Sequence, residues 1–278
     1  MNSKKYILTL DKDVWIFLKF LLKYFTYSFY FIFKLLIKIT LYNYFCQKYT
    51  PVAIIDNAEI SFTSSILTAY LKRKNILYID VMHGEKLFDI RDSFFRFSEC
   101  WVWNKHYINI FKRLYAYEKQ FKIGISPRHK KLKNNKIFFK NKKILKFYWG
   151  SEGESKKEEL QYILNGLHKL KGEGYKIIVR CHPSHINKNK FYRDGQYFFN
   201  DFILENAENK DSFHSLLGTY YALGTFTSIL YEADLMGKAI VINDYDNNLS
   251  SLEKLDYILV KNKNYIPFSK LVRDCKFM

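Results

Sequence analysis

Residues 220–242 read YYALGTFTSILYEADLMGKAIVI, and this stretch contains three elements in succession. Tyr220–Leu223 has the aromatic and aliphatic composition of a buried strand, and Ala239–Ile242 has the composition of a second one. Between them, Ser228–Met236 shows a helical pattern that follows a loop of glycine and hydroxyl residues. A strand, a helix and a second strand in such close succession form a βαβ unit, which predicts a parallel sheet.

The same alternation precedes this stretch along most of the chain. Further strands are expected at Val52–Asp56, Ile76–Val81, Trp101–Trp103, Phe121–Ile125, Ile144–Trp149 and Tyr175–Arg180. Helices are expected at Ser61–Arg73, Lys105–Glu118 and Lys156–Lys171. The Lys- and Asn-rich segment Arg128–Lys146 is interpreted as a linker. We therefore predict an α/β protein with two Rossmann-like open parallel-sheet domains that face a cleft, residues 1–140 and 141–278.

The composition is that of a globular protein with an excess of positive charge. The 278 residues are 48% hydrophobic, with 11 Gly and 4 Pro, and 45 Lys+Arg against 27 Asp+Glu give a net charge of +18. Residues 1–140 hold 25 of the basic and 10 of the acidic residues, whereas residues 141–278 hold 20 and 17. This excess favours an anionic partner, which can be a lipid headgroup, a nucleic acid or a phosphorylated substrate. Four widely spaced cysteines without a CxxC pair indicate a reducing cytoplasm.

An amphipathic helix is expected near the N-terminus. Residues Val14–Phe45 are aromatic and aliphatic, but their longest uncharged stretch, Tyr24–Phe33, is too short to span a bilayer. On a helical wheel the lysines of this region fall within an arc of roughly 100°; they are Lys12, Lys19, Lys23, Lys34, Lys38 and Lys48. Such a helix can lie in the interface of an anionic membrane, or it can pack in a core with its polar stripe facing solvent. A helix that spans the bilayer with snorkelling lysines is a third alternative.

The first candidate ligand site follows the strand that ends at Arg180. In an open α/β sheet, ligands bind beyond the carboxyl ends of the strands. Arg180 offers a bidentate fork for phosphate oxygens, and His182 can donate a second hydrogen bond to the same group. Pro183 fixes the turn that holds the imidazole. The alternative is an ordinary turn with a buried histidine.

The second candidate site lies in the quoted stretch, where the strand gives way to the helix. Gly224 allows close approach of a ligand to the backbone, and Thr225, Thr227 and Ser228 supply hydroxyl groups beside the free N–H groups of the helix start. Glu232, one turn into the helix, can bind a sugar or ribose hydroxyl. The alternative is a simple helix cap by Thr227 or Ser228.

Three further residues are candidates for proton transfer. His83 and Glu85 flank a glycine after the strand that ends at Val81, and either can take a proton from an acceptor hydroxyl. The alternative is a turn histidine beside a solvated glutamate. Glu152 lies between two glycines after the strand that ends at Trp149, in a loop type that is common in α/β domains.

The order of these motifs resembles bacterial GT-B glycosyltransferases of capsule, lipooligosaccharide (lipopolysaccharide), O-antigen and teichoic-acid assembly. These include the sialyltransferase and polysialyltransferase group and the polyol-phosphate transferases. In such families an His-Pro motif and a Ser/Thr motif hold the phosphate of the donor, and the matching residues here are His182, Pro183, Thr225, Thr227 and Ser228. The general base of the sialyltransferase group lies in an acidic-acidic-Gly motif, which Ser151-Glu152-Gly153 matches in part.

The resemblance implies a metal-independent and cofactor-free glycosyltransferase. It is expected to bind a nucleotide-sugar donor on the C-terminal domain and a lipid-linked oligosaccharide acceptor on the N-terminal domain, at the inner face of the cell membrane and without a nucleic-acid partner. No DxD pattern or cysteine cluster offers a metal site, and His182 and His185 flank a proline turn. Three alternatives remain: a CDP-polyol phosphotransferase of the same fold, a basic nucleic-acid-binding protein, and a non-catalytic partner of a transferase complex.

Overall fold

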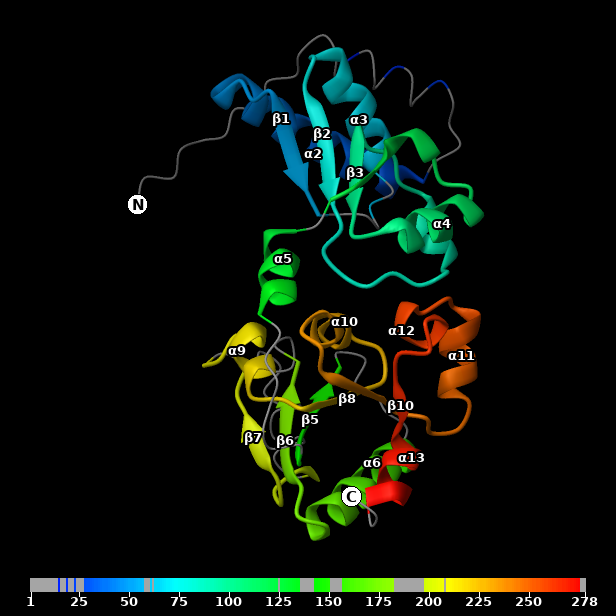
Figure 1. The fold of residues 1–278 in the computed structure, drawn as a ribbon. Helices are drawn as coiled ribbons and strands as arrows, with labels where there is room; N and C mark the ends of the chain where they lie inside the picture. Colours follow the sequence, from blue (N-terminus) through cyan, green and yellow to red (C-terminus); the bar gives the residue numbers. More distant parts are fainter. Residues whose placement is uncertain are drawn as a thin grey trace. The chain divides into compact units, whose positions relative to one another are not determined.

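A computed structural model describes residues 28–57, 61, 63–124, 126–135, 143–150, 157–182, 198–207 and 209–275, together with the single residues 15, 19 and 23. The chain divides into two compact units (Figure 1). The first unit comprises Met1–His83 and Asp89–Gly124, and the second comprises Gly84–Phe88 and Ile125–Met278. The division therefore falls after Gly124 rather than at residue 140, and the short segment Gly84–Phe88 belongs to the second unit.

The first unit contains a sheet of four parallel strands in the order β1-β2-β3-β4. The strands are β1 (Ala53–Asp56), β2 (Leu77–Val81), β3 (Glu99–Val102) and β4 (Phe121–Ile123). The helices are α2 (Phe29–Tyr49), α3 (Ser64–Arg73) and α4 (Lys105–Arg113), with 3₁₀ turns η1 (Ile90–Ser93) and η2 (Glu118–Gln120).

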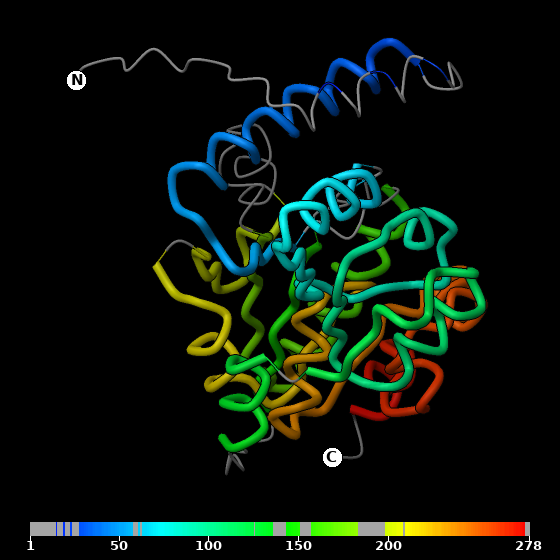
Figure 2. The backbone as a smooth tube through the Cα atoms, turned by 90° about the horizontal axis from the view of Figure 1, so that it is seen from above, coloured from blue at the N-terminus to red at the C-terminus, as the bar shows by residue number. Residues whose placement is uncertain are grey.

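Helices α2 and α3 lie on the same side of this sheet (Figures 1 and 2). The buried Tyr78 of β2 donates a hydrogen bond to Asp56 of β1 at 2.5 Å, and its hydroxyl lies 3.3 Å from that of Tyr42 on α2. Tyr70 of α3 donates to Asn43 of α2 at 3.0 Å. Buried tyrosines with satisfied hydroxyls thus connect α2 to the sheet and to α3.

The second unit contains six parallel strands in the order β10-β9-β8-β5-β6-β7. The strands are β5 (Ile144–Trp149), β6 (Lys176–Cys181), β7 (Ile203–Glu205), β8 (Tyr221–Gly224), β9 (Ala239–Ile242) and β10 (Ile266–Pro267). The helices are α5 (Pro127–Asn134), α6 (Lys157–Gly172), α9 (Ser212–Leu217), α10 (Ser228–Leu235), α11 (Asn248–Lys254), α12 (Ile258–Lys261) and α13 (Phe268–Asp274).

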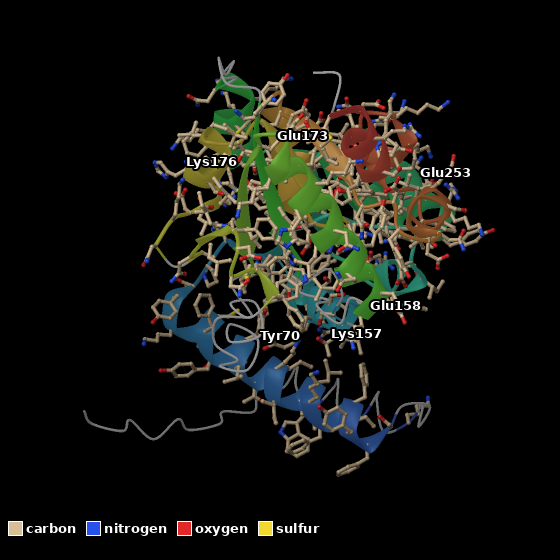
Figure 3. The ribbon with its side chains drawn as sticks, turned by 90° about the horizontal axis from the view of Figure 1, so that it is seen from below. Tyr70, Lys157, Glu158, Glu173, Lys176 and Glu253 are labelled. Carbon is tan, nitrogen blue, oxygen red and sulfur yellow. The ribbon has the colours of Figure 1, made fainter. Side chains whose placement is uncertain are left out.

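The period-two alternation of β5 determines which helices cover each face of this sheet. Leu145 and Phe147 belong to the main apolar core, which also includes buried residues of α6 and α13. At Gly166 of α6 an added Cβ would lie 2.5 Å from the ring of Phe268, so only glycine allows α13 to pack this closely. Figure 3 shows α6 along the sheet, with Glu158 near its start and Glu173 just beyond its end. Lys146 and Tyr148, which alternate with the core residues, face the opposite side and contact α9.

The interpretation of Arg128–Lys146 as a linker is wrong for its first part. Helix α5 begins after Ser126, whose hydroxyl accepts a hydrogen bond from the backbone N–H of His129 at 3.1 Å. His129 and Leu132 are buried, and α5 packs against α10. The lysines between and after these two positions lie on an exposed face of the helix. This exposed face accounts for the Lys-rich composition that favoured the interpretation as a linker.

Helix α2 has one buried face and one exposed apolar face. Its buried side chains include Ile32, Leu35 and Ile39, whereas a ridge with a spacing of four residues is exposed, formed by Phe33, Ile37, Leu41 and Phe45. In Figure 3 the ribbon of this helix is blue, and some of its side chains project on the side away from Tyr70. Lys38 was expected in the basic stripe, but its ammonium donates a hydrogen bond to the hydroxyl of Thr63 at 2.9 Å. Among the described residues, α2 is a helix that is long and apolar enough to cross a membrane, judged by length and composition alone. A third of its most apolar segment is buried in the protein.

Candidate functional site

A polar pocket lies where the strand order of the second sheet reverses. From β5 the chain order runs to β6 and β7 on one side, and to β8, β9 and β10 on the other. Ligands of open parallel sheets bind beyond the carboxyl ends of the strands at such a switch point. A pocket of about 310 Å³ is found there; it is lined by Arg128, Tyr148, Trp149, Arg180, Cys181, His182, Ala207, Asp211, Ser212, Thr227, Ser228, Ile229 and Glu232.

The structure brings five of the predicted site residues to this pocket, namely Arg180, His182, Thr227, Ser228 and Glu232. Gly224 and Thr225 are not among its lining residues. Gly224 ends β8, where an added Cβ would meet the carbonyl oxygen of Tyr148 at 3.3 Å. Thr225 accepts a hydrogen bond from the buried Asn243 at 3.1 Å. Pro183 and Glu152 lie outside the described residues.

Arg180 is held by a largely buried carboxylate beside the pocket. It lies at the end of β6 and donates to Glu205 of β7 at 3.0 Å. The same carboxylate accepts from Lys146 of β5 at 2.7 Å and pairs with Lys210 at 3.1 Å. Lys146, Arg180, Glu205 and Lys210 are called the Glu205 cluster below. Three cations around one carboxylate leave a positive excess at this wall of the pocket, which favours an anionic ligand.

The protonation of the Glu205 cluster follows from its hydrogen bonds. Burial opposes ionisation of Glu205, but hydrogen bonds from Lys146 and Ser215 lower its pKa to about 2. Burial lowers the pKa of Lys146, and the carboxylate of Glu205 opposes this shift. The Lys146 ammonium donates to Glu205, to the carbonyl oxygen of Ser215 and to its hydroxyl, so each of its three hydrogens has an acceptor.

The start of α10 forms another wall of the pocket. Thr227 is the N-cap residue, but its side chain makes no capping hydrogen bond, so a simple cap does not explain the hydroxyl groups at this position. Ser228 and Ile229, the first two residues of the helix, line the pocket. Their backbone N–H groups belong to the first turn, where α-helices bind anions such as phosphate.

Arg128 is a pocket residue that the sequence reasoning missed. It lies in the first turn of α5 and donates to Glu232 of α10 at 2.7 Å and to the hydroxyl of Ser212 at the start of α9. These three residues are called the Arg128 bridge below. Burial raises the pKa of Glu232, and the ion pair with Arg128 opposes this shift. Figure 1 shows α5, α9 and α10 at the same end of the second sheet.

The two proposed proton acceptors of the third motif belong to different units. His83 ends the first part of the first unit, whereas Glu85 lies in Gly84–Phe88 of the second unit. Phe88 donates its backbone N–H to Leu255 at 2.7 Å, which docks this segment on the second unit. Glu85 is buried and lies close enough to Tyr257 to help raise the pKa of that hydroxyl, the main cause being burial. Neither His83 nor Glu85 lines the pocket described above.

The described residues contain no group of three or more His, Cys, Asp or Glu side chains that can hold a metal ion. The pocket instead offers guanidinium, imidazole and hydroxyl donors together with a helix N-terminus. This combination is suited to binding a phosphate group through charge and hydrogen bonds.

No protein-family model matches the sequence, and no curated protein matches it. Solved structures do match the fold. Methanocaldococcus jannaschii UDP-GlcNAc 2-epimerase in complex with UDP-GlcNAc and UDP gives a TM-score of 0.57 at 15% identity, over 86% of this chain and 72% of that one. S. aureus MnaA with UDP gives 0.56 at 12%, over 86% and 68%. The wall teichoic acid polymerase TagF gives 0.50 at 14%, over 81% and 63%.

These likenesses confirm the predicted fold class. The chain is an α/β protein with two parallel-sheet units of the GT-B type. At 12% to 15% identity the likeness extends to the fold alone.

Proposed function

We propose that the protein is a nucleotide-sugar-dependent glycosyltransferase of surface-polysaccharide assembly. The observation that carries this proposal is the basic pocket at the switch point, where Arg180, His182 and the start of α10 converge. In this proposal the pocket holds the phosphates of the donor, and its positive charge stabilises the nucleoside phosphate as it leaves. The structures that share the fold include two solved with UDP, which supports a nucleotide as the ligand.

The proposed assignment of the two units follows from this pocket. The second unit binds the donor, and the first unit receives a lipid-linked oligosaccharide or surface polysaccharide. His83 and Glu85, which follow the end of β2 by two and four residues in the sequence, are the proposed acceptors of the proton from the attacking hydroxyl. Glu152 remains a further candidate for this role.

A membrane surface is the proposed location of the reaction. The exposed ridge of α2 places Phe33, Ile37, Leu41 and Phe45 on one face, and no acidic residue occurs in this helix. Lys34 and Lys48 are exposed on the same helix. Aromatic and aliphatic side chains flanked by lysines suit the headgroup region of an anionic leaflet. Helix α2 then serves both as a core helix and as a membrane-facing helix at the inner face of the cell membrane.

Transfer of a polyol phosphate from a CDP-polyol is the second candidate function. It is favoured by the likeness in fold to the wall teichoic acid polymerase TagF. The two candidates differ in the bond that breaks: glycosyl transfer breaks the bond between the anomeric carbon and the phosphate oxygen, whereas polyol-phosphate transfer breaks the P–O bond between the two phosphates of the CDP-polyol and releases CMP. Analysis of the transferred group, a sugar or a polyol phosphate, therefore distinguishes them.

The test is a thermal-stability measurement in mild detergent with CMP, CDP, UDP, GDP and dTDP and their sugar or polyol conjugates. Stabilisation by one nucleotide series is expected for the wild-type protein and is expected to disappear in Arg180→Ala and His182→Ala. Lys176→Ala, at the exposed start of β6, serves as a matched control that should keep the shift. Double-stranded DNA is included because stabilisation by DNA alone would replace this proposal by a nucleic-acid-binding function.

A further inference from the structure

The Arg128 bridge places an exposed cation and a buried carboxylate inside the same pocket. The side chain of Arg128 is 54% exposed, whereas that of Glu232 is 10% exposed. An exposed arginine can change its hydrogen-bond partner at little cost, because solvent screens the ion pair. A buried carboxylate cannot give up its partner at little cost, because its charge would then stay buried and unpaired.

The carboxylate of Glu232 also has a charge opposite to that of the groups in the pocket that favour an anion. Arg180 and His182 line the same pocket and favour an anion, and the start of α10 does so through its N–H groups. Glu232 and Asp211 line it as well and repel an anion. Asp211 already accepts hydrogen bonds from the backbone and ring of His214, whereas Glu232 has Arg128 as its cationic partner.

A phosphate that enters this pocket meets a guanidinium whose fork is suited to two of its oxygens. The hydrogen bonds to Glu232 and to the hydroxyl of Ser212 both come from the Nη2 nitrogen of Arg128. Because each of the two forks of a guanidinium uses one of the two Nη2 hydrogens, a phosphate that takes a full fork must displace one of these two acceptors. We propose that Arg128 binds the phosphate of the ligand and that Glu232 competes with this phosphate for it. The proposal rests on the function proposed above and deepens it.

The competition determines which ligands the pocket favours. A bare phosphate or pyrophosphate takes Arg128 and leaves the carboxylate of Glu232 buried without its cation, which lowers the affinity. A phosphorylated ligand that also carries hydroxyl groups can donate a hydrogen bond to this carboxylate and restore a partner. The bridge thus selects for a phosphate ester of a hydroxyl-bearing group, such as a nucleoside diphosphate, over inorganic anions.

Calorimetric titration with pyrophosphate and with UDP in metal-free buffer tests the proposal. Glu232→Gln removes the competing charge, so it should bind pyrophosphate about tenfold more tightly than the wild type, and the preference for UDP over pyrophosphate should fall. Arg128→Ala should bind pyrophosphate about tenfold more weakly. Lys130→Ala, which removes an exposed cation from the same helix, should bind both ligands as the wild type does.

The outcomes separate this proposal from the proposed function. If Arg180→Ala weakens binding but Arg128→Ala and Glu232→Gln do not change it, the competition is overturned and the donor site stands. If the wild-type protein binds neither pyrophosphate nor any nucleotide of the panel, the proposed function fails and the competition fails with it. Should Glu232→Gln not fold, Glu232→Asp shortens the reach of the carboxylate to Arg128, and a smaller tightening of pyrophosphate binding is then the expected result.

Discussion

Two carboxylates of the second unit have different surroundings: Glu205 lies beside the pocket, behind Arg180, and Glu232 lines it. Glu205 is surrounded by Lys146, Arg180 and Lys210, and Lys146 is only 1% exposed. Among the described residues, Glu232 is paired with Arg128, and that arginine is largely exposed. Burial of both partners makes a charge pair costly to break, because each charge then remains unsolvated without the other. Exposure of one partner makes the pair easy to exchange. We therefore infer that the Glu205 cluster shapes the site, while the Arg128 bridge responds to the ligand.

The largest expected effect is that of Glu205→Gln. The substitution leaves the buried ammonium of Lys146 without its counter-ion, and removal of one partner of a buried pair costs about 3–5 kcal/mol. The free energy of unfolding, measured by urea denaturation at pH 7, should fall by this amount. Glu158→Gln, at an exposed position of α6, is the matched control and should change it by about 0.5 kcal/mol or less.

The variant Lys146→Met with Glu205→Gln sharpens this result. Replacing a buried ion pair by residues of similar volume is often neutral, so the double variant should recover part of the stability that Glu205→Gln loses. If Glu205→Gln alone is as stable as the wild type, Lys146 needs no carboxylate partner, and the structural role of the Glu205 cluster is contradicted.

The second expected effect is a loss of stability in acid. Glu205 has a pKa of about 2 in the folded protein and an ordinary value of 4.5. Because the folded pKa is the lower one, its contribution to stability is fully present above pH 4.5 and is lost as the pH falls towards 2, by up to about 3 kcal/mol. Urea denaturation at several pH values should show this slope for the wild type. The slope should be smaller in Glu205→Gln, and an equal slope in both proteins would assign the acid transition to other groups.

The two regions also differ in how far their structure could be predicted from sequence. The strands β5, β8 and β9 have strong apolar runs, and the rule that ligands bind at strand ends then led to Arg180, His182 and the start of α10. The apolar pattern predicted the strand β5 but not the buried charge of Lys146 within it. That charge depends on the carboxylate of Glu205, which lies 59 residues further along the chain.

The Arg128 bridge was beyond the sequence pattern for a related reason. Arg128 and Glu232 are 104 residues apart, and their contact depends on how α5 packs on α10. The sequence did contain a signal for this helix, since Ser126 followed by Pro127 is typical of a helix start. Its many lysines concealed this signal. The separation of Gly84–Phe88 from His83 likewise depends on tertiary packing, which no local pattern encodes.

The smallest expected effect is that of Arg128→Ala on stability. An ion pair with one largely exposed partner contributes about 1 kcal/mol or less, and the variant also lets the buried carboxylate of Glu232 take up a proton, since burial already raises its pKa. Urea denaturation at pH 7 should therefore show a loss several times smaller than that of Glu205→Gln. The same variant is expected to lose pyrophosphate affinity, so the effect on binding should exceed the effect on folding. A loss of stability as large as that of Glu205→Gln would show that the bridge is a structural support, and the distinction between a region that shapes the pocket and a region that responds to its ligand would no longer hold.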